Sequence, residues 1–220
     1  MKTSRLIFEL GLRRSKKVII QRYGKEFYKD FKRLASEAVS QVISQMPDIG
    51  NTIFAFNYKF APTYIACYRA SQALGLTPDE IQDMLWHVNE RLITMVPKIF
   101  MKIFIRSYLN NFRHKAREHE RLGQEKLLHP FDWVIQYRNI NDTTFEIDIY
   151  ECGIMKLAAK FDALGILPSV CRVDYMMSNY MGAGFERTKT LGDGDDCCNC
   201  RYIIGGNCEW APDKGFIDRK

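Results

Sequence analysis

Thiol side chains are concentrated near the end of the sequence. Four of the seven cysteines fall within twelve residues: Cys197, Cys198, Cys200 and Cys208. A thiol becomes a strong nucleophile or metal ligand once it loses its proton, so we expect chemistry in this part of the chain. The preceding Asp193-Gly194 pair favours a tight turn with positive φ, which predicts two short strands joined around it.

A structural zinc site is one interpretation of these thiols. Side chains alternate along a strand, so Cys198 and Cys200 would share one face while Cys197 would point to the other. Only two thiols would then converge, without the two-residue gap that is usual in zinc-binding loops. We therefore predict no metal ion and no other cofactor. The simplest alternative is that cysteines are small buried apolar side chains, and we adopt it for Cys67.

Sequence signatures of common catalytic sites are absent. The chain has no Gly-x-Ser-x-Gly elbow, phosphate-binding loop, dinucleotide-binding glycine pattern or His-Glu-x-x-His motif. All four histidines precede residue 130. His114 and His119 are five residues apart, a spacing that does not align two ligands on one helix face. A histidine-based metal site is therefore not expected.

Helical patterns dominate residues 1–128, which we assign to one helical region. We predict helices over residues 15–46, 61–75 and 77–97, and a continuation to residue 123 after a break or kink at Pro97. The clearest start is at Thr77, which with Glu80 forms the capping-box pattern. In that pattern the hydroxyl accepts a hydrogen bond from the amide three residues on, and the carboxylate reaches back.

Residues 129–220 form a second region with an α+β pattern. Alternating apolar side chains predict a hairpin over residues 131–149, with its turn at 139–142. Helices over residues 153–164 and 168–181 should follow, before a second strand pair around Asp193-Gly194. Consecutive strand pairs without crossover helices build antiparallel sheets. We therefore predict an α+β fold in which a helical N-terminal half packs on a small antiparallel sheet with covering helices, as one compact unit.

Composition indicates a globular protein with enough apolar residues for a sizeable core. The chain is 46% hydrophobic and 26% charged, with a formal net charge of +6. No apolar run approaches the roughly 20 residues of a membrane span, so we expect no membrane association. Charges near the N-terminus argue against a secretion signal, and an odd number of cysteines favours reduced thiols in the cytoplasm. Acids interleave with the bases, which favours solvated helix surfaces over nucleic-acid binding.

Four ordered blocks surround several of the cysteines. They read YECGI at 150–154, VCRVDY at 170–175, FERTKTLGDG at 185–194 and CCNCRY at 197–202. Together they resemble the L-2-amino-thiazoline-4-carboxylic acid hydrolase family, over about residues 130–204. Members of that family often have Cys-Asp-Phe where this chain has Cys198-Asn199-Cys200, so an acidic residue is replaced by an amide and an aromatic residue by a thiol.

The resemblance implies hydrolytic opening of a small cyclic amidine, such as a thiazoline, to a carbamoyl amino acid. Either Cys171 or Cys198 could attack the ring carbon as a thiolate, or Asp174 could assist a water molecule; we favour the thiol. Asp174 lies three residues after Cys171, so both would project from one helix face. A thiolate at neutral pH needs a nearby cation, such as Arg187, to lower the pKa of the thiol.

The predicted substrate-binding residues are Arg187, Cys152, Asn199 and Cys200. The planar fork of Arg187 suits a substrate carboxylate. The alternative for this side chain is an ion pair with a nearby acid such as Asp174.

The alternative to an enzyme is a binding protein without catalytic activity. The same thiols and arginine could bind a small molecule or a metal ion as a sensor, with the helical half as a partner surface. An enzyme would need a thiol of low pKa near Arg187, whereas a sensor would need a closed site filled by thiolates. The expected partner of the enzyme is a small-molecule substrate, that of the sensor is a small molecule or a metal ion, and the chain could form a homo-oligomer.

Overall fold

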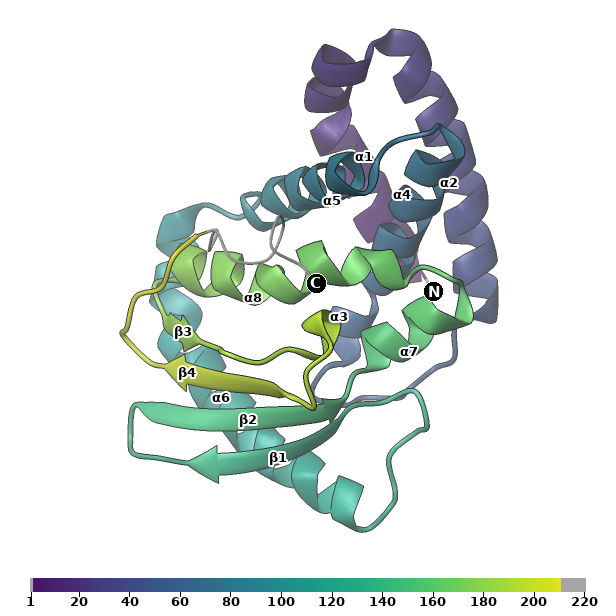
Figure 1. Cartoon of the computed structure of the whole chain (residues 1–220). Helices are drawn as coiled ribbons and strands as arrows, with labels where there is room; N and C mark the ends of the chain where they lie inside the picture. The colour runs from purple at the N-terminus through teal and green to yellow at the C-terminus, as the bar shows by residue number, and fades with distance from the viewer. Residues whose placement is uncertain (1, 211–220) are drawn as a thin grey trace.

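The computed structural model describes residues 2–210, so the last ten residues of the predicted α+β region lie outside this range. Helices make up the N-terminal part of the chain, and a four-stranded antiparallel sheet with the order β1-β2-β4-β3 follows, together with further helices. Figure 1 shows α8 above β3 and β4, with α6 behind the sheet. The predicted α+β fold class is confirmed.

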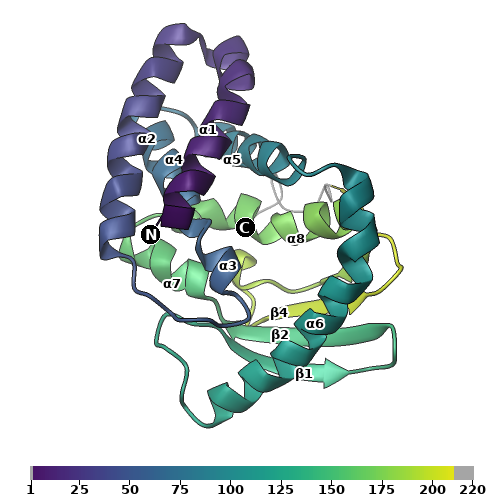
Figure 2. The same ribbon diagram turned by 180° about the vertical axis from the view of Figure 1, so that it is seen from behind.

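The N-terminal part consists of α1 (Lys2–Tyr23), α2 (Lys25–Gln45), α3 (Ala55–Tyr58), α4 (Ala61–Ala73), α5 (Pro78–Ile93) and α6 (Lys98–Gln124). The prediction of one helix over residues 15–46 is wrong. The chain reverses at Gly24, whose φ of 93° is accessible to glycine at no steric cost. Consequently α1 and α2 form the long helical hairpin seen from both sides in Figures 1 and 2.

The later helix boundaries in this part follow the predicted signals. Gly75, with a φ of 77°, lies just after α4. The amide of Thr77 donates to Glu80 Oε2 at 2.9 Å, and the amide of Glu80 donates to Thr77 Oγ1 at 3.4 Å, so the capping box is present. Pro97 separates α5 from α6. These three predictions are confirmed.

The sheet contains β1 (Val134–Asn139), β2 (Thr144–Glu151), β3 (Gly184–Glu186) and β4 (Cys198–Ile203). The hairpin of β1 and β2 is present as predicted. β3 and β4 also pair antiparallel, but the predicted tight turn at Asp193-Gly194 is wrong. A longer segment, residues 187–197, joins the two strands and contains a 3-10 turn, η2 (Leu191–Asp193). Gly194 has the expected positive φ of 93°, but at the end of that turn.

Two helices separate the strand pairs. α7 (Gly153–Lys160) ends earlier than predicted, and a 3-10 turn, η1 (Leu164–Ile166), precedes α8 (Leu167–Met181). Gly165 does not end a helix. A glycine is required at this position because a Cβ there would lie 2.5 Å from the hydroxyl oxygen of Tyr68. α8 begins beside Pro168 as predicted and ends at Gly182, whose φ is 80°.

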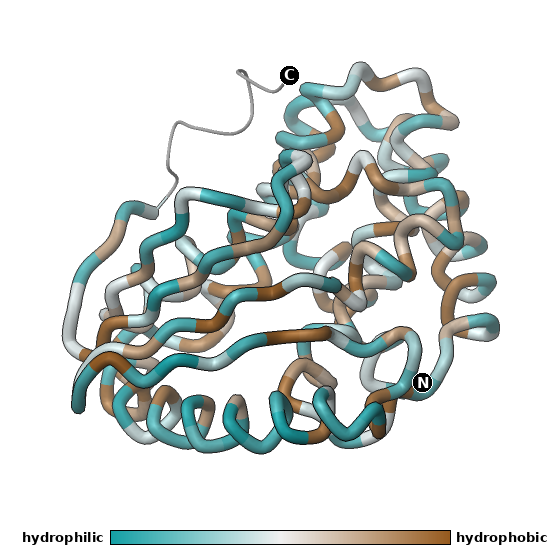
Figure 3. Tube along the Cα trace, turned by 60° about the horizontal axis from the view of Figure 1, so that its bottom comes forward, coloured by the Kyte–Doolittle hydropathy of each residue, from teal (hydrophilic) through white to brown (hydrophobic). Residues whose placement is uncertain are grey.

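The sheet has one apolar and one charged face. On the apolar face, Ile149 pairs with Cys198 and Ile147 pairs with Cys200, and α6 runs along this side (Figure 3). The opposite face carries an ion-pair ladder made of Arg138, Glu146, Asp148, Arg201 and Glu186. β4 therefore points its cysteines towards the covering helices.

One hydrophobic cluster extends from Phe8 in α1 to Ala183 before β3. This cluster includes residues on both sides of the predicted boundary between residues 128 and 129. That boundary remains a prediction. Within residues 2–210, no helix is long and apolar enough to cross a bilayer.

Candidate active site

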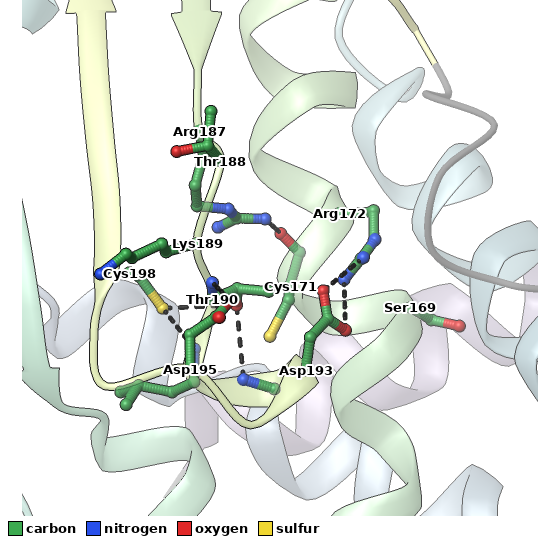
Figure 4. A network of polar contacts seen from close by, with 12 residues as sticks. Ser169, Cys171, Arg172, Arg187, Thr188, Lys189, Thr190, Asp193, Asp195 and Cys198 are labelled. Carbon is green, nitrogen blue, oxygen red and sulfur yellow. Dashed lines mark hydrogen bonds and ion pairs between the residues drawn. The ribbon is translucent and has the colours of Figure 1, made fainter. Parts of the chain in front are cut away.

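Three segments bring Cys171, Arg187 and Cys198 close together (Figure 4). α8 supplies Cys171 and Asp174, the segment after β3 supplies Arg187, and β4 supplies Cys198 and Cys200. The alternation along β4 buries Cys198 and Cys200 on one face, as predicted from their spacing. The charge of Arg187 influences the pKa of Cys171, Asp174 and Cys200, so these groups lie within electrostatic range of one guanidinium.

Arg187 forms the centre of this cluster. Its Nη1 lies 3.0 Å from Asp174 Oδ2, and its Nη2 donates to the carbonyl oxygen of Cys171. The guanidinium carbon is 5.6 Å from the ring centroid of Tyr175 and 5.4 Å from that of Phe185. The Arg187 side chain is only 5% exposed. The ion pair with Asp174 is therefore present in the structure. The sequence suggested this pair as the alternative to substrate binding by Arg187.

Asp174 combines a buried environment with access to solvent. Burial raises the pKa of its carboxyl above the usual range, and the charge and hydrogen bond of Arg187 oppose that shift. The side chain nevertheless remains 34% exposed. A carboxyl group in this setting can exchange a proton with a reacting group nearer to neutral pH than an ordinary aspartate does.

Burial dominates the titration of Cys171, of Cys200 and of Cys152, which lies between β2 and α7. It raises the pKa of Cys171, although Arg187 and the Thr190 hydroxyl act in the opposite direction. Burial also raises the pKa of Cys200, and it raises that of Cys152 to about 12. The expected lowering of the thiol pKa by Arg187 is thus one contribution at Cys171, and it is outweighed there.

Cys198 has polar contacts of a different kind. The backbone amide of Leu191 donates to its Sγ at 3.3 Å, and Thr190 Oγ1 lies 3.4 Å from the same sulfur. Thr190 is itself 4% exposed. Thr190 could not be selected from the sequence alone, because its contacts depend on the irregular path of residues 187–197.

A second ion pair fastens that segment to α8. Arg172 donates to both carboxylate oxygens of Asp193, at 3.2 and 2.7 Å. Gly192 lies directly against Cys171, where a Cβ would be 2.7 Å from Sγ. Gly192, which precedes the Asp193-Gly194 pair, is the sequence signal of this close approach.

Asn199 lies apart from the thiols. It follows Cys198 in β4 and pairs with Asp148, so its side chain belongs to the charged face of the sheet. Its Oδ1 accepts hydrogen bonds from the amides of Thr188 and Lys189, at 3.0 and 2.7 Å. The structure thus places Asn199 where it holds the segment that carries Arg187.

A cavity between two N-terminal helices lies outside this cluster. A cavity of about 620 Å³ lies between α1 and α2, where its lining includes Lys16, Lys25, Lys29 and Lys32, and none of the predicted site residues lines it. Residues 2–210 contain no group of three or more metal-ligating side chains that could hold an ion. All seven cysteines are free thiols.

The fold and the cluster define an α+β protein in which thiols, a carboxyl and an arginine meet between a helix and an antiparallel sheet. The model of the family described as L-2-amino-thiazoline-4-carboxylic acid hydrolase matches residues 57–202. The chain belongs to this family. The match begins in α3, so it includes most of the helical half as well as the blocks that suggested the resemblance. None of the curated proteins matches the chain.

Proposed function

We propose that this protein hydrolyses a small cyclic amidine of the thiazoline class to a carbamoyl amino acid. The observation that carries the proposal is the meeting of Cys171, Cys198, Asp174 and Arg187 within the part of the chain that matches the hydrolase family. Together these residues offer a nucleophile, a proton donor and a cation for a substrate carboxylate.

Cys198 is our candidate for the nucleophile. The Leu191 amide and the Thr190 hydroxyl, which contact its Sγ, are the type of donors that hold negative charge on a sulfur atom. Cys171 is the second candidate, because burial raises its pKa and so disfavours the thiolate. Thr190 acts in this proposal as a positioning residue.

The reaction can be written with these groups alone. The thiolate of Cys198 attacks the amidine carbon, and the ring bond from that carbon to sulfur or nitrogen breaks while Asp174 gives its proton to the departing ring atom. Water then adds to the carbon, gives one proton to an amidine nitrogen and one back to Asp174, and the thiolate of Cys198 departs, so that the carbamoyl product forms. The raised pKa of Asp174 supports its role as the proton donor. Direct attack by water, assisted by Asp174, is the second route.

Arg187 is the proposed partner of the substrate carboxylate. Since it already pairs with Asp174, a bound carboxylate would share its guanidinium. Protonation of Asp174 would release part of that guanidinium for the substrate. Cys152 and Cys200 are proposed as neutral thiols beside the substrate, and Asn199 as the residue that holds the segment of Arg187 in place.

The test is turnover of L-2-amino-thiazoline-4-carboxylate, followed by mass spectrometry of the carbamoyl product. We expect product with the wild type and with Cys67→Ala, a control at a buried thiol in α4. Cys198→Ala should lose at least ~100-fold in kcat. Full activity of Cys198→Ala would remove it as the nucleophile. Substrate binding without turnover by the wild type would favour the sensor alternative.

A further inference from the structure

The first half of α6 exposes a continuous row of large apolar side chains. Six of them have exposed fractions between 43% and 67%: Val96, Ile99, Phe100, Ile103, Phe104 and Tyr108. With 3.6 residues per turn, their spacing places them on one side of the helix and the residues just before it. We call these six residues the α6 stripe.

The face of α6 opposite the stripe is apolar too. Ile105, Leu109 and Ala116 point the other way and are at most 8% exposed. A helix that is apolar on both faces is typical of a buried element, whereas a surface helix has one polar face. The first half of α6 is therefore apolar on two sides, and residues 2–210 cover only one of them.

We propose that a second copy of this chain covers the α6 stripe, so that the protein is a homodimer with paired α6 helices. The six side chains expose on the order of 600 Å². A two-fold pair would bury about 1,200 Å² in total, the lower end of stable protein interfaces. Most of the stripe is carried by a helix whose other side, with Ile105 and Leu109, packs into the hydrophobic core.

The charges beside the stripe agree with this occupant. Between Glu90 and Glu118 the sequence has no acidic residue, and Lys102 and Arg106 lie along one flank of the stripe only. A two-fold axis parallel to α6 brings this flank against the uncharged flank at Tyr108 of the partner subunit, which avoids like charges and allows cation–π contacts.

A lipid surface is a poorer match for the same face. Helices that lie in a bilayer interface have a charged face opposite the apolar one. In α6 that opposite face is buried in the protein. A second copy of the chain therefore suits the stripe better than a bilayer does.

The test measures the mass of the full chain in solution by light scattering and by sedimentation equilibrium. We expect twice the 25.7 kDa of the chain for the wild type. The variant Ile103→Glu/Phe104→Glu should be a monomer, because two charges in the apolar contact should raise the dissociation constant at least ~100-fold. The control is Leu6→Glu, at a residue 58% exposed on α1, which should remain a dimer.

Two results would overturn the proposal. One is a wild type that is monomeric at every concentration, and the other is a dimer that persists in Ile103→Glu/Phe104→Glu with unchanged circular dichroism. A monomeric wild type that sediments with anionic phospholipid vesicles, and a double variant that does not, would assign the stripe to a membrane. Thermal unfolding of each variant separates loss of the contact from loss of the fold.

Discussion

Replacing Arg187 with methionine should destabilise the protein by leaving the Asp174 carboxylate without its ion-pair partner. The Arg187 side chain is 5% exposed, and its Nη1 lies 3.0 Å from Asp174 Oδ2. Breaking a fully buried pair costs roughly 3–5 kcal/mol. Because Asp174 is 34% exposed, water can replace part of the lost interaction, and we expect about 2 kcal/mol. For a chain of this size that lowers Tm by roughly 4–8 °C.

The loss of stability in Arg187→Met should be larger at neutral pH than near pH 4. Burial raises the folded-state pKa of Asp174 and Arg187 opposes the shift, so Arg187→Met should raise this pKa further. A carboxyl whose folded-state pKa exceeds its unfolded value of about 3.9 destabilises the fold as the pH rises from that value through the folded-state pKa. The part of the stability loss that is due to the Asp174 carboxylate should therefore be small near pH 4 and reach its full size at neutral pH.

The measurement is chemical unfolding between pH 4 and 8 of the wild type, Arg187→Met, Asp174→Asn and the double variant. At pH 7 the double variant should be more stable than Arg187→Met, because the unpaired carboxylate is gone. Lys189→Met is the control: its ion pair with Asp196 is exposed to solvent, so its loss should leave the stability nearly unchanged. A double variant no more stable than Arg187→Met, or a loss independent of pH, would refute the reasoning.

Three further substitutions test other parts of the structure by thermal unfolding. Gly192→Ala should cost roughly 1–3 kcal/mol and reduce turnover, because its Cβ would lie 2.7 Å from Cys171 Sγ; unchanged stability and turnover would contradict the close packing. Thr77→Ala removes the capping box with Glu80 and should cost about 1 kcal/mol, whereas Thr77→Ser should retain most of it. Gly24→Ala places a side chain at a φ of 93° and should cost at least about 1 kcal/mol; a neutral effect would contradict the reversal between α1 and α2.

Much of the fold could be predicted because its signals are local. The capping box at Thr77 and the alternation of Phe145, Ile147 and Ile149 depend on a few neighbouring residues, and both are present in the structure. The placement of Cys171 and Asp174 on one helix follows from the same kind of reasoning. Local periodicity was therefore enough to assign some of the site residues to the correct helix or strand.

The remaining features depend on contacts between distant segments. The apolar pattern continues across Gly24, so nothing in the periodicity revealed that two helices meet there. The contacts of Thr190 with Cys198, and of Arg172 with Asp193, exist because residues 187–197 fold back against α8 and β4. The net upward shift of the Cys171 pKa likewise reflects burial, which a nearby arginine in the sequence could not reveal.

The most direct test of the proposed chemistry is the intact mass of the protein, quenched during turnover of L-2-amino-thiazoline-4-carboxylate. We predict a population heavier by the mass of one substrate, with the added mass on the peptide that contains Cys198 and absent from Cys198→Ala. Product formation by Cys198→Ala at the wild-type rate, with no adduct in either protein, would contradict covalent hydrolysis at this thiol.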